Sequence, residues 1–95
     1  MFKKSANRTV VVSNPQGLHA RPCLAIVNAL RGLSATVKIR NGKQVVDATS
    51  ILQLMTLAAT QGTELVLLAK GPDADKALEA LTELFVCGFD GHLDQ

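Results

Sequence analysis

The stretch "NPQGLHARPC", residues 14–23, separates strand-like from helix-like sequence. Before it, "TVVVS" (9–13) is short and rich in β-branched residues, which is typical of a strand. The turn residues of "NPQG" (14–17) end that strand. The stretch therefore predicts a strand, a turn and a helix in direct succession, with His19 at the junction. The apolar residues that recur at helical spacing after the turn are Cys23, Ile26, Val27 and Leu30.

The rest of the chain predicts three further strands and two further helices. Residues 34–40 alternate small or apolar with polar side chains, as a half-buried strand does, and the Asn41-Gly42 pair after them is a strong hairpin signal. This order favours an α+β fold with the helices on one face of a mainly antiparallel sheet. The remaining elements are expected as a strand over 43–48, a short helix over 50–60, a strand over 64–70 and a helix from Asp73 to Phe85.

The short helix starts with a capping pattern. Ser50 and Gln53 have the spacing of a capping box, in which the serine hydroxyl and the glutamine side chain each accept a hydrogen bond from the other residue's backbone N–H. We therefore expect Ser50 at the N-cap.

Length and composition narrow the class of protein. The 95 residues are expected to form one domain, and with 47% of them hydrophobic they can bury a core without disulfides. Aromatic residues make up only 3%, which leaves little for stacking on bases, so nucleic-acid binding is not expected. Cys23 and Cys87 lie far apart in sequence and are expected as free thiols in a reducing compartment.

The sequence carries no targeting pattern that we recognise. No apolar run approaches the roughly 20 residues that cross a bilayer. The first residues, "MFKKSANR", have no apolar segment after their basic residues, so a signal peptide is not expected. The expectation is a cytoplasmic protein with no membrane insertion.

Charge is divided between the two halves of the chain. Residues 1–46 hold eight basic residues and no acid, whereas residues 47–95 hold eight acids and two basic residues, Lys70 and Lys76. One interpretation is a basic surface that meets an anionic ligand or an acidic partner. The other is that the two halves interleave in the fold and the charges mix.

The junction at His19 has the features of an anion site. If a helix starts just after His19, its first backbone N–H groups have no intrahelical acceptors, and the helix dipole adds partial positive charge. Arg21 adds a full charge and several donors suited to phosphate. Pro22 suits the first turn of a helix, and Gly17 permits a left-handed turn before it.

Three roles are open to His19 from the residues alone. Neutral imidazole is available near pH 7, so His19 could be a nucleophile that takes a phosphoryl group. It could also be a simple anion contact, or merely a helix cap. A metal site with Cys23, Cys87 and His92 is a weaker alternative, since the spacing fits no common zinc pattern and no metal is expected. Cys23 could be a reactive thiol or, more in keeping with its position, a small core residue.

With these residues in view, "NPQGLHARP" resembles the phosphorylation-site signature of the HPr family, the histidine-containing phosphocarriers of the bacterial phosphotransferase system. The resemblance covers about residues 8–88, the expected core of the domain, with short tails on either side. "NGK", "SILQLMTL" and "TQGTEL" match the family in register. The ending "LFVCGFD" and the segment "DATSI" are similar to NPr, the nitrogen-branch paralogue.

The resemblance implies an open-faced β-sandwich of order βαββαβα, with four antiparallel strands and three helices on one face. It implies that His19 accepts a phosphoryl group on Nδ1 from enzyme I and passes it to an EIIA-type acceptor, without a cofactor. Arg21 would neutralise the group, and the backbone around Gly17, Ala20 and Pro22 would cradle it. Such a protein is a phosphoryl carrier rather than a turnover enzyme.

The resemblance also implies a docking surface on the first two helices. Two usually basic positions of this surface are Asn28 and Gln53 here, which bears on the choice of partner. Periodicity leaves Leu24 and Leu52 facing outward. The implied docking residues are Leu24, Val27, Ile51, Leu52, Gln53 and Met55.

Ser50 matches a regulatory serine that HPr kinase modifies in many family members, although its N-cap role alone also explains it. Thr49, before it, stands where sugar-branch proteins usually have lysine. The alternative function is thus a regulatory binding module that acts through Ser50 or the docking face without phosphoryl relay.

Strand alternation places one set of apolar residues on the uncovered face of the sheet. Val11, Val66 and Leu68 are expected there, opposite the core-facing residues of the same strands. They could form a self-association contact, or they could be scattered surface residues. A monomer is the expectation.

Overall fold

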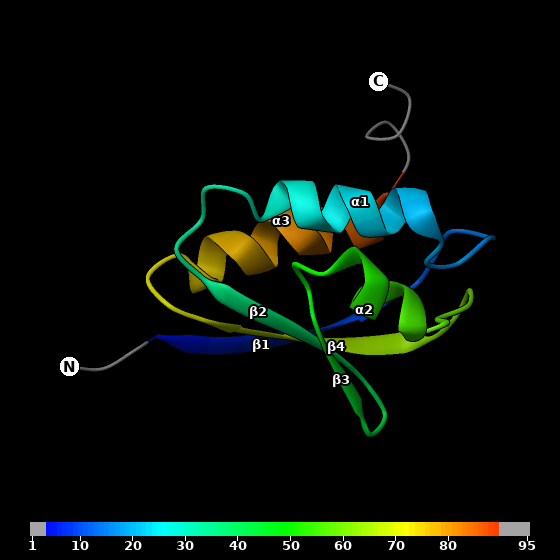
Figure 1. The fold of residues 1–95 in the computed structure, drawn as a ribbon, viewed down its shortest axis with the longest axis horizontal. Coiled ribbons are helices and arrows are strands. Elements are labelled where there is room, and N and C mark those ends of the chain that lie inside the picture. Colours follow the sequence, from blue (N-terminus) through cyan, green and yellow to red (C-terminus); the bar gives the residue numbers. More distant parts are fainter. Residues whose placement is uncertain (1–3, 90–95) are drawn as a thin grey trace.

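The structure, a computed structural model of the chain, describes residues 4–89. It confirms the predicted order of strands and helices (Figure 1). No helix within residues 4–89 is long and apolar enough to span a membrane. The elements are β1 (Ser5–Val11), α1 (Ala20–Ala29), β2 (Thr36–Asn41), β3 (Gln44–Asp47), α2 (Ile51–Thr56), β4 (Glu64–Lys70) and α3 (Ala74–Val86).

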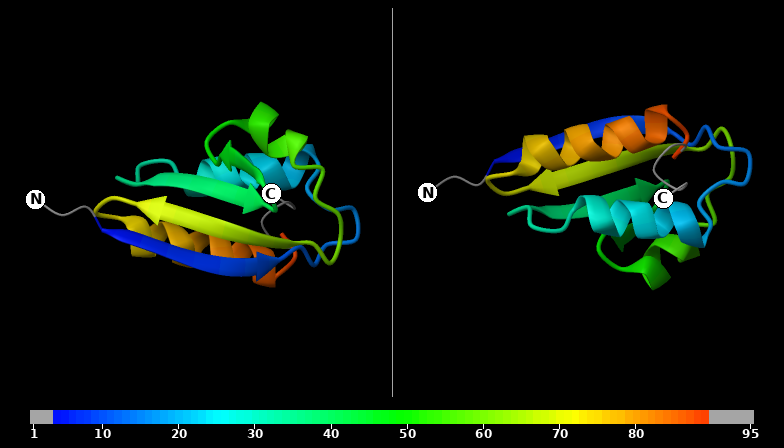
Figure 2. Two further views of the ribbon diagram at one scale, coloured as in Figure 1. Left: turned by 90° about the horizontal axis from the view of Figure 1, so that it is seen from below. Right: turned by 90° about the horizontal axis from the view of Figure 1, so that it is seen from above.

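The strands form one antiparallel sheet in the order β1-β4-β2-β3. All three helices lie on the same side of it, so one face of the sheet is covered and the other is open (Figures 1 and 2). This is the α+β arrangement expected from the sequence. It follows from strands whose alternate residues are apolar, because such strands can bury only one face.

The core lies between the covered face of the sheet and the helices. It is almost entirely aliphatic, as the composition requires, and a single layer of helices is enough to close it. The strands contribute Val10, Val37, Ile39, Leu65 and Leu67, and the helices contribute Ile26, Leu54, Leu78, Leu81 and Phe85.

The first strand lies earlier in the chain than the sequence pattern predicted. The prediction was 9–13, but β1 runs from Ser5 and pairs along the whole of β4, from Ser5 opposite Lys70 to Val11 opposite Glu64. Its first half lacks apolar alternation because β1 is an edge strand, exposed along most of its length. Ser13 leaves the strand altogether, and its hydroxyl donates to the Phe85 carbonyl at 2.9 Å.

The second helix is shorter than the expected 50–60. It ends at Thr56, with Leu57 as its C-cap. Ala58 follows with φ of +48°, a left-handed conformation that cannot continue a right-handed helix. The chain then turns back through residues 59–63 to enter β4 (Figure 1).

Half of the predicted capping box is present. The Ser50 hydroxyl accepts a hydrogen bond from the Gln53 backbone N–H at 3.2 Å, which confirms Ser50 as the N-cap. The reciprocal bond was wrongly predicted. The Gln53 side-chain oxygen accepts instead from the Asp47 backbone N–H at 3.0 Å, and the Ser50 N–H donates to the Asp47 carbonyl.

Candidate functional site

The turn that precedes α1 is held by hydrogen bonds from its own residues and from a distant loop. The Gly17 N–H donates to the Asn14 carbonyl at 3.1 Å, and the Asn14 side-chain amide donates back to the Gly17 carbonyl. The Leu18 N–H donates to the Ala59 carbonyl at 2.9 Å, which ties the turn to the segment after α2. Leu18 itself is buried, so the residues directly before His19 are fixed in place.

Gly17 is required at this position for two reasons. Its φ is +69°, which side-chain-bearing residues rarely adopt. A Cβ atom here would also overlap the Ala59 carbonyl oxygen, the same atom that accepts from Leu18. The close approach of the two backbones therefore depends on the missing side chain.

His19 occupies the N-cap position of α1, with an extended backbone (φ −90°, ψ −168°). Its carbonyl accepts the first helical hydrogen bond, from the Cys23 N–H at 3.2 Å. Its side chain makes no capping hydrogen bond. The capping alternative is thus wrong for the imidazole, since the helix is capped here through the backbone alone, and the partly exposed ring stands beside the helix start.

The three residues after His19 form the first turn of the helix. Ala20 and Arg21 are exposed, and Pro22 is buried. Since the first N–H groups of a helix point out along its axis, this end of α1 combines a helix dipole with a basic side chain. His19, Arg21 and the turn at Gly17 therefore lie together at the N-terminal end of α1. In Figure 1 this end of α1 lies on the side of the molecule where the connection from β1 runs.

Cys23 is a core residue. Its side chain is fully buried, its thiol lies 3.9 Å from the Leu18 carbonyl, and burial raises the pKa of the thiol. A raised pKa keeps sulfur in its unreactive protonated form. In residues 4–89 no group of three potential ligands could hold a metal ion, and His92, which belonged to the metal alternative, lies outside these residues.

Exposed apolar side chains lie on α1 and α2, which contact each other. Leu24 is 46% exposed, Leu52 80% and Met55 44%, which confirms that Leu24 and Leu52 face outward. Val27 and Ile51 are half-buried and pack against the core. Five of the six predicted docking residues thus offer apolar surface in the same part of the molecule.

The sixth predicted docking residue, Gln53, is exposed but engaged. Its side-chain oxygen is held by the Asp47 N–H, so only the rest of its amide faces solvent. Ser50 is half-buried, and its hydroxyl is occupied by the N-cap bond. Both polar side chains therefore stabilise the start of α2.

Two residues of the site were not found from the sequence. Asn14 was noted only as a turn residue, but it is buried and its amide shapes the turn; its side-chain oxygen has no partner among the described residues. Ala59 contributes through its backbone carbonyl, which no residue pattern reveals. The available signal for Asn14 was an asparagine three residues before a glycine. The sequence holds no signal for the role of Ala59.

Basic and acidic residues from the two halves of the chain meet where β1 packs against α3. Lys4, just before β1, forms an ion pair with Asp75, and Arg8 of β1 donates to the Thr82 hydroxyl at 3.3 Å. The interpretation that the two halves interleave therefore holds here, and the basic surface that meets an anionic partner stays a prediction.

Comparisons with known proteins add independent evidence. The family model described as "PTS HPr component phosphorylation site" matches residues 6–86. The chain is 33% identical over 87 residues to phosphocarrier protein NPr of Escherichia coli (strain K12), a match that covers 90% of this chain and 97% of NPr. It is 39% identical over 74 residues to DhaM of Providencia stuartii, the phosphoryl donor subunit of a PEP-dependent dihydroxyacetone kinase. That match covers 78% of this chain but 16% of DhaM.

The fold is also found among solved structures. HPr-C-His from Thermoanaerobacter tengcongensis superposes with a TM-score of 0.84 at 32% sequence identity. The superposition covers 88% of this chain and 94% of that one.

Proposed function

The chain belongs to the HPr family of phosphocarrier proteins of the phosphotransferase system, which relay a phosphoryl group through a histidine, and from this premise we propose that His19 is the carrier residue here. His19 is the only histidine of the sequence within the matched residues 6–86. The observation that carries the proposal is the position of its imidazole. The ring stands at the start of α1 without serving as a cap, so it is available for chemistry.

The transfer requires no cofactor. A neutral imidazole nitrogen, Nδ1 in our proposal, attacks phosphorus as the bond to the donor atom breaks, and the reverse sequence delivers the group to the acceptor. Arg21 and the N–H groups that open α1 stabilise the charge on the phosphoryl oxygens. The backbone at Gly17, Ala20 and Pro22 fixes this geometry, because the turn is tied to Ala59.

Members of the family exchange the group with partners such as enzyme I and EIIA. We propose that both partners dock on the exposed apolar surface of α1 and α2, centred on Leu24, Leu52 and Met55. Weakly held apolar contacts suit a carrier that must leave each partner after transfer. Asn28 and Gln53 carry no charge, so this surface selects partners with less acidic docking faces than a basic surface would.

The test is phosphorylation by phosphoenolpyruvate and enzyme I, followed by mass measurement before and after acid treatment. We expect one acid-labile phosphoryl group, absent in His19→Ala and retained in the control His92→Ala, which removes the other histidine of the sequence. Retention of the group in His19→Ala would refute the assignment. Acid-stable phosphate on Ser50 with no relay would instead support a regulatory module.

A further inference from the structure

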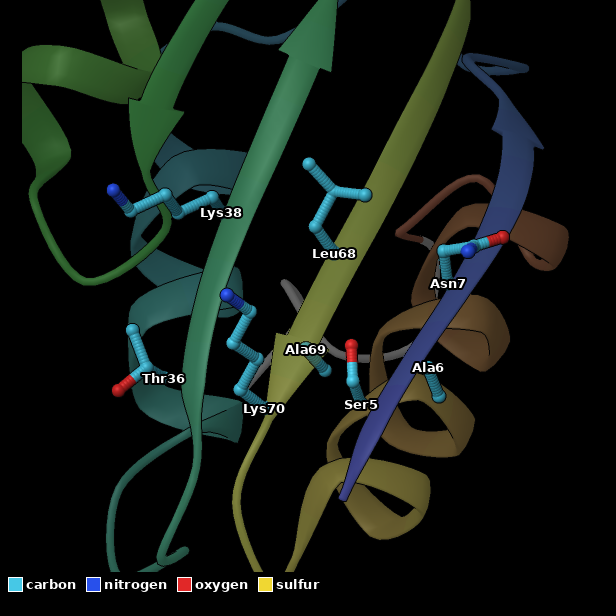
Figure 3. Close-up of a pocket in the computed structure, with 8 residues that line it drawn as sticks. All are labelled: Ser5, Ala6, Asn7, Thr36, Lys38, Leu68, Ala69 and Lys70. Atoms are coloured by element: carbon cyan, nitrogen blue, oxygen red, sulfur yellow. The ribbon is translucent and has the colours of Figure 1, made fainter. Parts of the chain in front are cut away.

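The open face of the sheet carries a pocket at the end remote from His19. It is lined by residues of β1, β2 and β4 (Figure 3). Ser5, the first residue of β1, lines this pocket. The seven-residue strand ends at Val11, and the turn that leads to His19 follows it. At about 3.3 Å per residue, the strand alone separates the two places by roughly 20 Å. The pocket is therefore a separate feature from the His19 site.

The strand register places the lining side chains in two neighbouring rows. Asn7, Leu68 and Lys38 are directly opposite one another in the first row. Ser5, Lys70 and Thr36 form the second row, one pleat further on. Figure 3 shows Leu68 between Lys38 and Asn7, with the Lys70 side chain running up beside β2 and the Lys38 side chain extending from β2 on the side away from Leu68. The pocket thus has an apolar centre, hydroxyl and amide groups beside it, and two flexible lysine side chains at its β2 side.

Within residues 4–89 neither Lys38 nor Lys70 is held in an ion pair, whereas Lys4 pairs with Asp75. Hydrogen bonds from Thr49 lower the pKa of the Asp47 carboxyl, and the charge of Lys38 acts on it and contributes to the same lowering. Asp47 lies opposite Lys38 on β3, but its carboxylate accepts from the Thr49 N–H at 2.8 Å and the Thr49 hydroxyl at 2.7 Å. Both hydrogen bonds go to the same oxygen, Oδ1, and Asp47 is not among the residues that line the pocket.

The register places the two lysines close enough for one anion to contact both. Lys38 is opposite Leu68, and Lys70 is two residues further along β4, so the two are diagonal neighbours on one face. Diagonal cross-strand neighbours are about 7–8 Å apart, within reach of long side chains. Like charges at such positions repel, and an anion that contacts both ammonium groups removes the repulsion and gains two charge-assisted hydrogen bonds.

We propose that this pocket binds a small organic phosphate monoester, with the phosphate between Lys38 and Lys70 and the carbon body over Leu68. Lysine binds phosphate as a point charge, and a phosphate monoester carries nearly two negative charges at about pH 7, which two ammonium groups match. Ser5 and Thr36 lie beside Lys70 in the second row and offer hydroxyl donors for the remaining phosphate oxygens. Half-buried Leu68 favours a ligand with an apolar part over a bare ion.

The test is a titration of the whole chain with propyl phosphate, a phosphate monoester with an apolar carbon body, followed by ¹H–¹⁵N NMR. We expect saturable shifts of the amides of Ser5, Asn7, Lys38, Leu68 and Lys70. Lys38→Gln and Lys70→Gln should each weaken binding about tenfold, because each removes one charge-assisted hydrogen bond. The control Lys43→Gln makes the same charge change in the β2–β3 turn, outside the pocket, and should bind as the parent does.

Two further ligands test the chemical class. Inorganic phosphate should shift the same amides with lower affinity, since it leaves Leu68 uncovered, and succinate should bind more weakly than propyl phosphate. Equal weakening by all three lysine variants, shifts confined to the His19 end, succinate binding as tight as the phosphate ester, or no saturation at millimolar ligand would each overturn the proposal. These outcomes are independent of whether His19 carries a phosphoryl group.

Discussion

The His19 end of the molecule and the open face of the sheet both gather positive charge, but they are built differently. At the His19 end the backbone makes the site: a left-handed glycine, a helix start and a carbonyl from another loop set the geometry. On the open face the side chains make it, because strand register alone brings Lys38 and Lys70 together. A site made of backbone tolerates little change of chain conformation, whereas a site made of side chains tolerates substitution and loses only affinity.

The largest effect should come from adding one methyl group to the turn. Gly17→Ala places a Cβ against the Ala59 carbonyl at positive φ, and we expect it to lower the free energy of unfolding by at least about 3 kcal/mol and to slow phosphoryl acceptance. Gly42→Ala is the matched control, with φ of +62° but nothing within 4 Å of the added atom, and should cost about 1 kcal/mol. Urea unfolding measures both. Equal losses would show that the contact with Ala59 is unimportant.

The second-largest effect tests whether partners dock on the apolar surface of α1 and α2 or on the open face of the sheet. Leu52→Ser removes the most exposed of the apolar docking side chains, and we expect transfer from enzyme I to slow about tenfold, or about 1.4 kcal/mol. Stability should change by less than about 0.5 kcal/mol, because the residue is 80% exposed. The control Val11→Ser, 47% exposed on the open face, should leave transfer rates unchanged. A slower Val11→Ser would place docking on the sheet instead.

The third effect concerns the cap of α2, which supports the docking surface. Ser50→Ala removes the acceptor for the Gln53 N–H and should lower the free energy of unfolding by about 1 kcal/mol. Ser50→Asn, which supplies another good N-cap acceptor, should restore most of the loss. Thermal and urea unfolding give the comparison. An alanine variant as stable as the parent would leave regulation, rather than capping, as the reason for this serine.

The smallest effect lies on the open face. Hydrogen bonds from the Thr49 hydroxyl and N–H, with a contribution from the charge of Lys38, hold the pKa of Asp47 below its ordinary value. A depressed folded pKa means that the stabilisation is present above the unfolded pKa and is lost as pH falls through the folded pKa. Asp47→Asn should therefore lower stability slightly at about pH 7 and flatten its decline toward about pH 3. An unchanged decline in that range would show that Asp47 does not contribute to it.

The parts of the fold that follow from side-chain periodicity were predictable, and the parts that follow from backbone contacts were not. The helix start after His19, the hairpin at Asn41-Gly42 and the two faces of β4 were all visible in the pattern. The polar first half of β1 was hidden, because an edge strand with an open face needs no alternation.

The candidate site shows the same division. Arg21 and Gly17 could be picked out because their residue types carry the chemistry, and the family signature around His19 gave them roles. The role of the Ala59 carbonyl could not be predicted, because every residue has a backbone carbonyl. The partner of Gln53 was wrongly predicted for a related reason. The spacing predicted that its side-chain oxygen accepts from the Ser50 N–H, but this oxygen accepts from the backbone N–H of Asp47, at the end of β3.

The strand order has a consequence for how the chain is made on the ribosome. β4 lies between β1 and β2, yet it is the last strand to be synthesised. Until residue 70 leaves the exit tunnel, β1 has no partner, and only the β2–β3 hairpin can form by local pairing. The first strand of the nascent protein must therefore stay unpaired until residue 70 has been made, and the His19 turn cannot be fixed until Ala59 is available.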